Sequence, residues 1–314
     1  MNDRNSRIVI TGAAGLVGQN LVVELESQGY TNLLCIDKHG YNLGILESLH
    51  SGIQTLHADL AESGTWEQAL RGADCVILLH AQITGKHAAT FVRNSIEATA
   101  RVLEACRAAS IPYLVHVSSS VVNSAADDDY TRTKRLQEQM VVSAGLAHCV
   151  LRPTLMFGWF DPKHLGWLSR FMARSPVFPI PGDGRYMRQP LYERDFCRCI
   201  VDCMQRRPQG AVFDIVGDTR IDYVDIILTI KRVLELRTLL VHIPIGLFSA
   251  LLRTYALFSR KPPFTADQLK ALTAGDDFTG VDTQATFNVR QTPFEDAMRE
   301  TFRDPRYAGV VLRR

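Results

Sequence analysis

The sequence feature that most constrains the fold lies near the start of the chain, where residues 7–18 read RIVITGAAGLVG. A short apolar run at residues 8–10 leads into three glycines, and apolar residues at helical spacing follow as far as Leu25. This order predicts a buried parallel strand, a tight turn and the N-terminus of a helix. An ordinary βα turn is the alternative, since the spacing G-x-x-G-x-x-G differs from the commonest dinucleotide fingerprint. The strand before the glycines and the helix after them favour nucleotide binding.

Each glycine has a separate role in this prediction. Gly12 lets the chain turn sharply after the strand, Gly15 lets backbone N–H groups approach a pyrophosphate, and Gly18 lets the helix lie close to the sheet. Leu16 and Val17 then begin a helix whose N–H groups and positive dipole end hold phosphates.

Composition narrows the class of protein. With 314 residues, the chain has room for one large or two modest domains. A hydrophobic content of 46%, a charged content of 22% and a net charge of +2 describe a globular protein with no expected nucleic-acid partner. The seven cysteines include no C-x-x-C pair, so we predict neither a disulfide framework nor a metal site. The polar N-terminus shows no signal-peptide pattern, so a reducing cytoplasm is the expected location.

One apolar segment, residues 239–258, has to be weighed against membrane insertion. It falls short of an uninterrupted spanning run, because polar residues and a proline break it at His242, Pro244 and Arg253. We predict a strand over residues 239–243 and a helix from about 245 to 259, packed inside its own domain. Alternatively, Arg260 and Lys261 after the helix favour an anionic membrane surface or a partner protein.

A second strand, residues 32–36, ends in Asp37. An acidic residue about twenty positions beyond the glycine turn accepts hydrogen bonds from the adenosine ribose hydroxyls. Its charge also repels a 2′-phosphate, so NAD is favoured over NADP, although the adjacent Lys38 weakens this argument. Alternatively, Asp37 only forms the turn before Gly40.

Strands and helices alternate through the first half of the chain. Three further apolar runs, residues 53–57, 75–79 and 113–117, alternate with helical patterns, of which one covers residues 94–108. This alternation predicts a doubly wound α/β sheet with right-handed crossovers, or Rossmann-like fold. We expect a dinucleotide-binding domain at residues 1–155, with returning segments from about 190–220. Most of residues 156–314 then form a smaller, mixed lobe for the substrate.

Polar residues follow two of these strands at the carboxyl edge, where ligands bind in open parallel sheets. Asp59 and Leu60 come after the third strand, and His80 and Ala81 after the fourth. His80 either contacts the cofactor or is an oriented, neutral core histidine.

The residues that carry chemistry follow the fifth strand. Tyr130 and Lys134 are four positions apart, so they lie on one face of a helix. An ammonium group beside a phenol lowers the pKa of the phenol from its ordinary value near ~10. Such a pair can move a proton to or from a carbinol oxygen while a nicotinamide exchanges hydride. A hydroxyl of the serines at 118–120 would hold the same oxygen.

The chain resembles the extended short-chain dehydrogenase/reductase superfamily, which includes NAD-dependent sugar epimerases and dehydratases. The resemblance implies that Ser119 is the hydroxyl donor, with Ser120 its competitor, and that Tyr130 is the acid/base. Lys134 would tune the phenol and bind the nicotinamide ribose. The matching stretches are TGAAGLVG at 11–18, Asp37, Asp59-Leu60, Asn94, VSSS at 117–120, YTRTK at 130–134, LRPTLMFG at 151–158, the glycine turn at 182–184, Arg188 and PLYERD at 190–195.

Two departures place the chain in a divergent branch. V-N-S at 122–124 replaces the V-Y-G of sugar-nucleotide epimerases, and the loop before Tyr130 is short. With PFTADQLKAL at 263–272, these features resemble the nucleotide-carrying accessory subunit of respiratory complex I and its bacterial relatives. By the wider resemblance, Arg188 grips the diphosphate of a sugar nucleotide, because its guanidinium donors fork onto phosphate oxygens, and Gln189 lies beside the substrate. Alternatively, Arg188 is a surface arginine in a glycine-rich hairpin and does not bind the substrate.

The leading hypothesis is an NAD-dependent oxidoreductase or epimerase acting on a nucleoside-diphosphate sugar. The alternatives are a carbonyl or hydroxysteroid-type dehydrogenase, whose apolar pocket residues 239–258 would line, and a non-catalytic nucleotide-bound subunit. The expected cofactor is NAD, and the expected partners are the substrate and a second copy of the chain as a homodimer.

Overall fold

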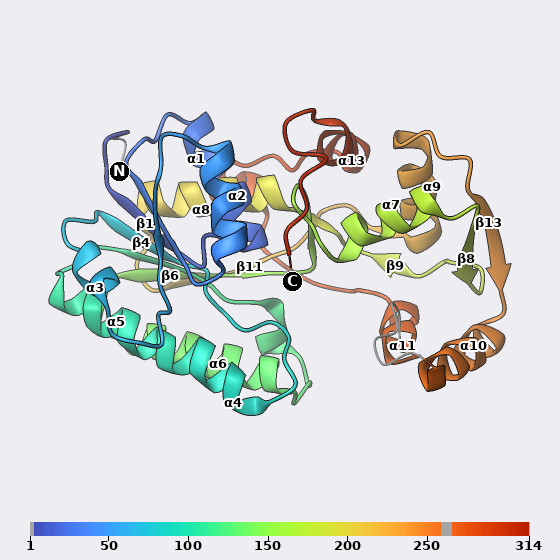
Figure 1. Ribbon diagram of the computed structural model, residues 1–314, viewed down its shortest axis with the longest axis horizontal. Coiled ribbons are helices and arrows are strands. Elements are labelled where there is room, and N and C mark those ends of the chain that lie inside the picture. Colours follow the sequence, from blue (N-terminus) through green and yellow to red (C-terminus); the bar gives the residue numbers. More distant parts are fainter. Residues whose placement is uncertain (1–2, 259–265, 314) are drawn as a thin grey trace.

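The computed structural model describes residues 3–258 and 266–313 (Figure 1). Its centre is a parallel sheet of seven strands in the order β11-β6-β5-β4-β1-β2-β3, so the Rossmann-like prediction is confirmed. The strands are β1 (Ile8–Thr11), β2 (Leu33–Asp37), β3 (Gln54–His57), β4 (Cys75–Leu78), β5 (Leu114–Val117), β6 (His148–Pro153) and β11 (Ala211–Ile215). Every residue of β1, β4 and β5 is buried, as continuous apolar runs predict for strands with covered faces.

Helices cover both faces of this sheet. In Figure 1, α1 (Leu16–Ser27), α2 (Gly40–Leu49) and α8 (Glu193–Arg206) lie above the sheet. Helices α3 (Thr65–Ala69), α5 (Ala98–Ala108) and α6 (Asp129–Val142) lie below it. Alternate strand residues divide between two apolar clusters, so Ile8 and Ile10 pack toward α1 and α8 while Val9 packs toward α5.

The helix predicted over residues 94–108 differs in its first turn. A short helix, α4 (Ala88–Phe91), runs into a π-helical turn, η1 (Val92–Glu97), before α5 begins. The π turn aims Ser95 at the loop after β4, where its hydroxyl oxygen accepts a hydrogen bond from the backbone N–H of Gln82 at 3.0 Å.

The second half of the chain forms a smaller mixed lobe, on the right of Figure 1. Three two-stranded pairs build it, and its core gathers Phe157, Phe178, Ile227 and Phe294. Its strands are β7 (Met156–Phe157), β8 (Val177–Pro181), β9 (Met187–Arg188), β10 (Leu191–Tyr192), β12 (Ile221–Asp222) and β13 (Leu239–Ile243). Its helices are α7 (His164–Arg174), α9 (Tyr223–Val233), α10 (Ile245–Phe258), α11 (Ala266–Ala274) and α13 (Phe294–Arg303). Helix α12 (Thr283–Phe287) packs instead on α8 of the nucleotide-binding half.

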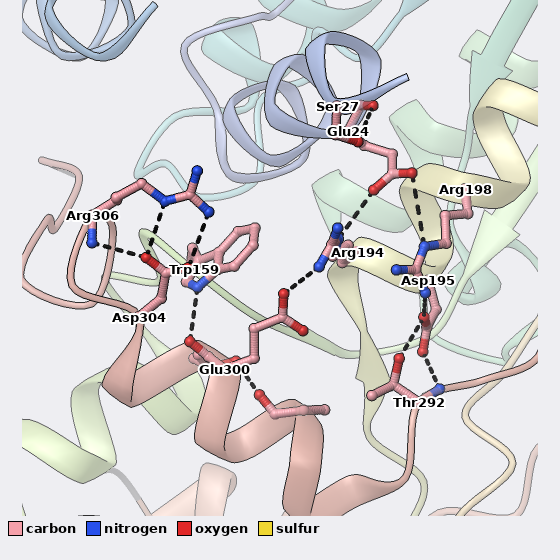
Figure 2. Close-up of polar contacts among 12 residues, drawn as sticks. Glu24, Ser27, Trp159, Arg194, Asp195, Arg198, Thr292, Glu300, Asp304 and Arg306 are labelled. Atoms are coloured by element: carbon pink, nitrogen blue, oxygen red, sulfur yellow. Dashed lines mark hydrogen bonds and ion pairs between the residues drawn. The ribbon is translucent and has the colours of Figure 1, made fainter. Parts of the chain in front are cut away.

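A network of charged side chains joins α1, α8 and α13 (Figure 2). The guanidinium of Arg194 donates to the buried carboxylate of Glu24 at 3.1 Å and also pairs with Glu300. The next residue of α8, Asp195, accepts two hydrogen bonds from Thr292, at 2.7 and 2.9 Å. These contacts fix the C-terminal segment against the nucleotide-binding half of the chain.

The apolar segment at 239–258 forms the predicted strand and helix, β13 and α10, although Ser259 lies outside the described residues. Its predicted packing inside the domain is wrong along one face, because Leu239 is 60% exposed and Leu247 is 56% exposed. No described helix has the length and apolar character needed to cross a membrane.

All seven cysteines are free thiols in buried positions, and three of them lie on α8. The others lie on β2, β4, β6 and α5. Burial, aided by the negative charge of Glu26, raises the pKa of Cys35 to about 12, so this thiol stays protonated.

Candidate active site

The glycine turn has the geometry that its sequence predicts. Gly12 has a φ of +73°, and a Cβ at this position would lie 2.6 Å from the backbone nitrogen of His80. A Cβ on Gly18 would lie 2.4 Å from the carbonyl oxygen of Ala13, so α1 packs against the turn itself. Gly15 is the N-cap of α1, whose first N–H groups have no acceptor within the helix. This end of α1 is therefore free to bind an anion.

A cavity of about 580 Å³ opens at this turn, along the carboxyl edge of the sheet. It brings together all the predicted site residues except Arg188 and Gln189. Those lining it are Gly12, Gly15, Leu16, Val17, Asp37, Asp59, Leu60, His80, Ala81, Ser119, Ser120, Tyr130 and Lys134.

At one end of the cavity, the carboxylate of Asp37 closes the glycine turn. One of its oxygens accepts from the N–H of Ala14 at 3.0 Å, and the other accepts from the N–H of His39 at 2.8 Å. Asp59 lies nearby, where Arg93 donates to its carboxylate at 2.7 Å. Partial burial raises the pKa of Asp59, but the hydrogen bonds from Arg93 and Ala61 outweigh it and lower the pKa overall.

At the centre of the cavity, Ser119 and Tyr130 meet. Ser119 ends the loop after β5, and α6 presents Tyr130 one residue after its start. Burial raises the pKa of the Tyr130 phenol, while a hydrogen bond with the side chain of Ser119 lowers it and the charge of Asp128 raises it. The net shift is upward, so the phenol holds its proton at neutral pH.

The expected effect of Lys134 on Tyr130 is absent, and the reason is where the ammonium group lies. Its Nζ donates to the carbonyl oxygen of Val117 at 3.0 Å and to Oε1 of Gln137 at 2.7 Å. Lys134 is only 2% exposed, and this burial lowers its pKa to about 7 even though the charge of Glu138 raises it. Lys134 therefore changes charge close to neutral pH.

A buried chain of hydrogen bonds continues from Gln137 to the end of β1. The amide nitrogen of Gln137 donates to the hydroxyl of Thr99 at 2.8 Å, and that oxygen lies 3.0 Å from Nε2 of His80. On the other side of the ring, Nδ1 lies 2.8 Å from the hydroxyl oxygen of Thr11, which itself donates to the carbonyl of Ile77.

Hydrogen bonds to both ring nitrogens hold the His80 imidazole in one orientation. Burial, reinforced by the positive charge of Lys134, lowers the pKa of His80 to about 3. His80 is therefore the oriented neutral histidine of the sequence analysis, and it also lines the cavity.

The far end of the cavity is mostly apolar, with Leu155, Met156 and Phe278 in its wall. Arg188 lies just outside it, 18% exposed, with its Nε 3.0 Å from a carboxylate oxygen of Asp276. The amide of Gln189 is buried and binds the backbone of Phe278, accepting from its N–H at 2.7 Å. Both residues thus secure the segment that carries Asp276 and Phe278, which also line the cavity.

Sequence reasoning missed Gln137, Thr99, Asp276 and Phe278. Gln137 follows Lys134 by three positions on one helix, so its contact with the ammonium was readable from the spacing. No local pattern links the other three to the site.

Comparison with known proteins shows the family to which the chain belongs. The model of the NAD dependent epimerase/dehydratase family matches residues 8–216. The chain belongs to this family. The matched residues include the glycine turn and the cluster of Ser119, Tyr130 and Lys134.

Among curated members of the family, a ceramide reductase of Caulobacter vibrioides is 26% identical over 178 residues, 57% of this chain. The match spans 55% of that reductase, about half of its length. A 4-hydroxy-2-methyl-3-oxo-4-farnesyl-3,4-dihydroquinoline-1-oxide ketoreductase of Stigmatella aurantiaca is 27% identical over 231 residues, 66% of this chain and 67% of that protein.

Solved structures in the family share the fold along nearly the whole chain. A UDP-glucose 4-epimerase of Thermotoga maritima, solved with UDP-glucose, superposes with a TM-score of 0.74 at 18% identity, covering 94% of this chain and 97% of that one. A UDP-glucuronic acid 4-epimerase of Bacillus cereus, solved with NAD, gives 0.70 at 20% identity, covering 94% and 96%.

Proposed function

We propose that this chain is an NAD-dependent oxidoreductase that interconverts a secondary alcohol and a ketone at Ser119, Tyr130 and Lys134. The observation that carries the proposal is that one cavity holds both the glycine turn and these three side chains. The donor set suits NAD, because the N-terminus of α1 binds phosphate and the carboxylate of Asp37 accepts from ribose hydroxyls. The acidic Asp37 also favours NAD over NADP.

NAD, when bound, supplies the hydride acceptor or donor. Gly12, Gly15 and the first residues of α1 would hold its phosphates, with Asp37, Asp59 and Leu60 at the adenosine end. His80, Ala81 and Lys134 would line the nicotinamide end.

The chain's own residues would manage the proton and the reacting oxygen. Ser119 and Tyr130 donate hydrogen bonds to that oxygen, and Tyr130 delivers or removes the proton. The raised pKa keeps the phenol protonated, so Tyr130 can donate its proton to a ketone oxygen. Lys134, held by Val117 and Gln137, would bind the nicotinamide ribose.

Two substrate classes are candidates. The first is a nucleoside-diphosphate sugar, whose ring hydroxyl would be oxidised and then reduced from the same or the opposite face. This class rests on the structural likeness to UDP-sugar epimerases along nearly the whole chain. It requires Arg188 to exchange Asp276 for a phosphate.

The second candidate is a lipophilic carbonyl compound. The substrate end of the cavity supports it, because Leu155, Met156 and Phe278 lie there. Among the described residues that line this end, the acids and bases are Asp276 and His164. An apolar wall with a carboxylate is a poor site for a diphosphate. The relatives named for ceramide and for a farnesylated quinoline agree with this second class.

One assay separates these possibilities. The purified protein is incubated with NAD and a panel of nucleotide sugars, and with NADH and a panel of long-chain and prenylated ketones. Tyr130→Phe should reduce turnover of the true substrate by about 10²–10⁴-fold. Tyr41→Phe, on an exposed tyrosine outside the cavity, is the matched control and should keep full activity.

Conversion of neither panel by a wild-type protein that still binds NAD would contradict the enzymatic proposal. That result would favour the third possibility, a non-catalytic nucleotide-bound subunit.

A further inference from the structure

Six apolar side chains lie exposed on the smaller lobe, on β13, on its partner strand β8 and on the first half of α10. We name this surface the β13–α10 face. The exposed fractions of its side chains run from 38% for Val241 to 60% for Leu239. Its members are Val177, Leu239, Val241, Ile245, Leu247 and Leu251.

The pairing of the strands explains why these residues share a side. In the parallel pair of β8 and β13, Leu239 lies opposite Val177. Phe178 and Ile180, which alternate with Val177, are buried in the core of the lobe. The outer side of the pair therefore holds the exposed residues, because side chains alternate along a strand.

The helix continues this surface. Leu247 and Leu251 are four positions apart on α10 and so lie on one face, and both are more than half exposed. The apolar face of a helix in a globular protein is normally buried. Helix α10 instead leaves these leucines in solvent, and an exposed apolar surface of this kind marks an interaction site.

The charge of this segment indicates what the site binds. The sequence holds no Asp or Glu between Glu235 and Asp267, whereas Arg237, Arg253, Arg260 and Lys261 fall in the same interval. Arg237 and Arg253, which the structure describes, are both exposed. Apolar side chains interspersed with arginines, and without acids, complement the apolar interior and negative surface of an anionic membrane.

We propose that the β13–α10 face docks on the surface of an anionic phospholipid bilayer. The contact is interfacial, with the leucines in the acyl boundary and the arginines at the headgroups. Helix α10 packs against α11, and the segment after α11 carries Asp276 and Phe278 into the wall of the cavity (Figure 1). Docking would thus bring the substrate end of the cavity close to the lipid.

Vesicle co-sedimentation of the full chain tests this proposal without requiring turnover, so its result is independent of the proposed activity. The probes are phosphatidylcholine vesicles with and without phosphatidylglycerol. We expect binding to the anionic vesicles that weakens as salt is added. The double variant Leu247→Glu, Leu251→Glu should lower binding at least tenfold, and Arg253→Gln about fivefold.

Val142→Glu is the matched control, because Val142 is 48% exposed on α6 and lies far from the β13–α10 face in sequence and fold. It should bind as the wild type does. Absence of wild-type binding to anionic vesicles, or equal loss with the control, would overturn the proposal. So would a wild-type dimer that the double variant dissociates while vesicle binding is unchanged, since a second copy would then cover the face.

Discussion

The first strand–helix unit of the chain and the last strand–helix unit of the smaller lobe make an instructive pair. β1 with α1 and β13 with α10 share one local pattern, a short apolar strand followed by an apolar helix. Ile8, Val9 and Ile10 have no exposed surface, whereas Leu239 is 60% exposed. Local sequence therefore determines the element, but not what covers it.

The difference comes from the neighbours that distant parts of the chain supply. β1 lies between β2 and β4 in the large sheet, and α8 packs along α1. β13 pairs only with β8 among the described strands. The first unit thus completes a core, and the second ends at the surface.

The largest effect should come from a charge placed in each unit. Leu21 on α1 is completely buried, so Leu21→Asp should lower the free energy of unfolding by more than about 4 kcal/mol. Leu251→Asp on α10 should change it by no more than about 0.5 kcal/mol. Denaturant unfolding measures both values, and a comparable loss at the two positions would mean that α10 is covered in solution.

Glycine replacements give the next largest contrast. Gly18→Ala forces a Cβ to within 2.4 Å of the Ala13 carbonyl oxygen, which should cost about 3 kcal/mol of stability and weaken NAD binding. Gly246→Ala meets no atom within 4 Å and should be neutral or stabilise α10 by up to ~1 kcal/mol. Thermal unfolding and NAD titration of both variants check this pair. Tolerance of Gly18→Ala would show that the turn can relax.

Removing one arginine that contacts α1 and one that lies on α10 should give a smaller contrast. Arg194→Ala removes one of the two arginines that pair with the buried Glu24, the other being Arg198, and Arg194 is itself partly exposed, so we expect a loss of about 2 kcal/mol. Arg253→Ala should change stability by less than about 0.5 kcal/mol. Equal stability of the two variants in urea would show that the network in Figure 2 contributes nothing.

The smallest effect is a difference in pH dependence. Burial lowers the pKa of Lys134 from 10.5 to about 7, so between these pH values the unfolded chain holds a proton that the folded chain lacks. Wild-type stability relative to Lys134→Met should therefore rise with pH, by about 1 kcal/mol between pH 7 and pH 8. The stability of Arg253→Ala should depend on pH in the same way as that of the wild type. Parallel curves for Lys134→Met as well would contradict the lowered pKa.

Many residues that line the cavity could be predicted because they directly follow the carboxyl ends of parallel strands. Parallel strands end at one edge, so Asp37, Asp59, His80 and Ser119 had to lie near the glycine turn. The periodicity of residues 239–258 likewise predicted β13 and α10. These inferences depend only on spacing along the chain.

The rest depended on contacts between distant residues. The ion pair of Arg188 with Asp276, far along the chain, is one such contact, and the diphosphate-binding role of Arg188 stays a prediction. The predicted lowering of the Tyr130 pKa assumed a free ammonium group, whereas Val117 and Gln137 hold Lys134 in a buried position. Burial and pairing of this kind leave no periodic trace in a sequence.

The seven buried thiols have a practical consequence. All of them lie in the large sheet or in the helices α5 and α8 that pack on it, and none lies in α10 or its neighbours among the described residues. A maleimide reagent would therefore label only molecules in which the sheet has opened. Alkylation rates, resolved by peptide mass, would time the opening of the nucleotide-binding half with no engineered label.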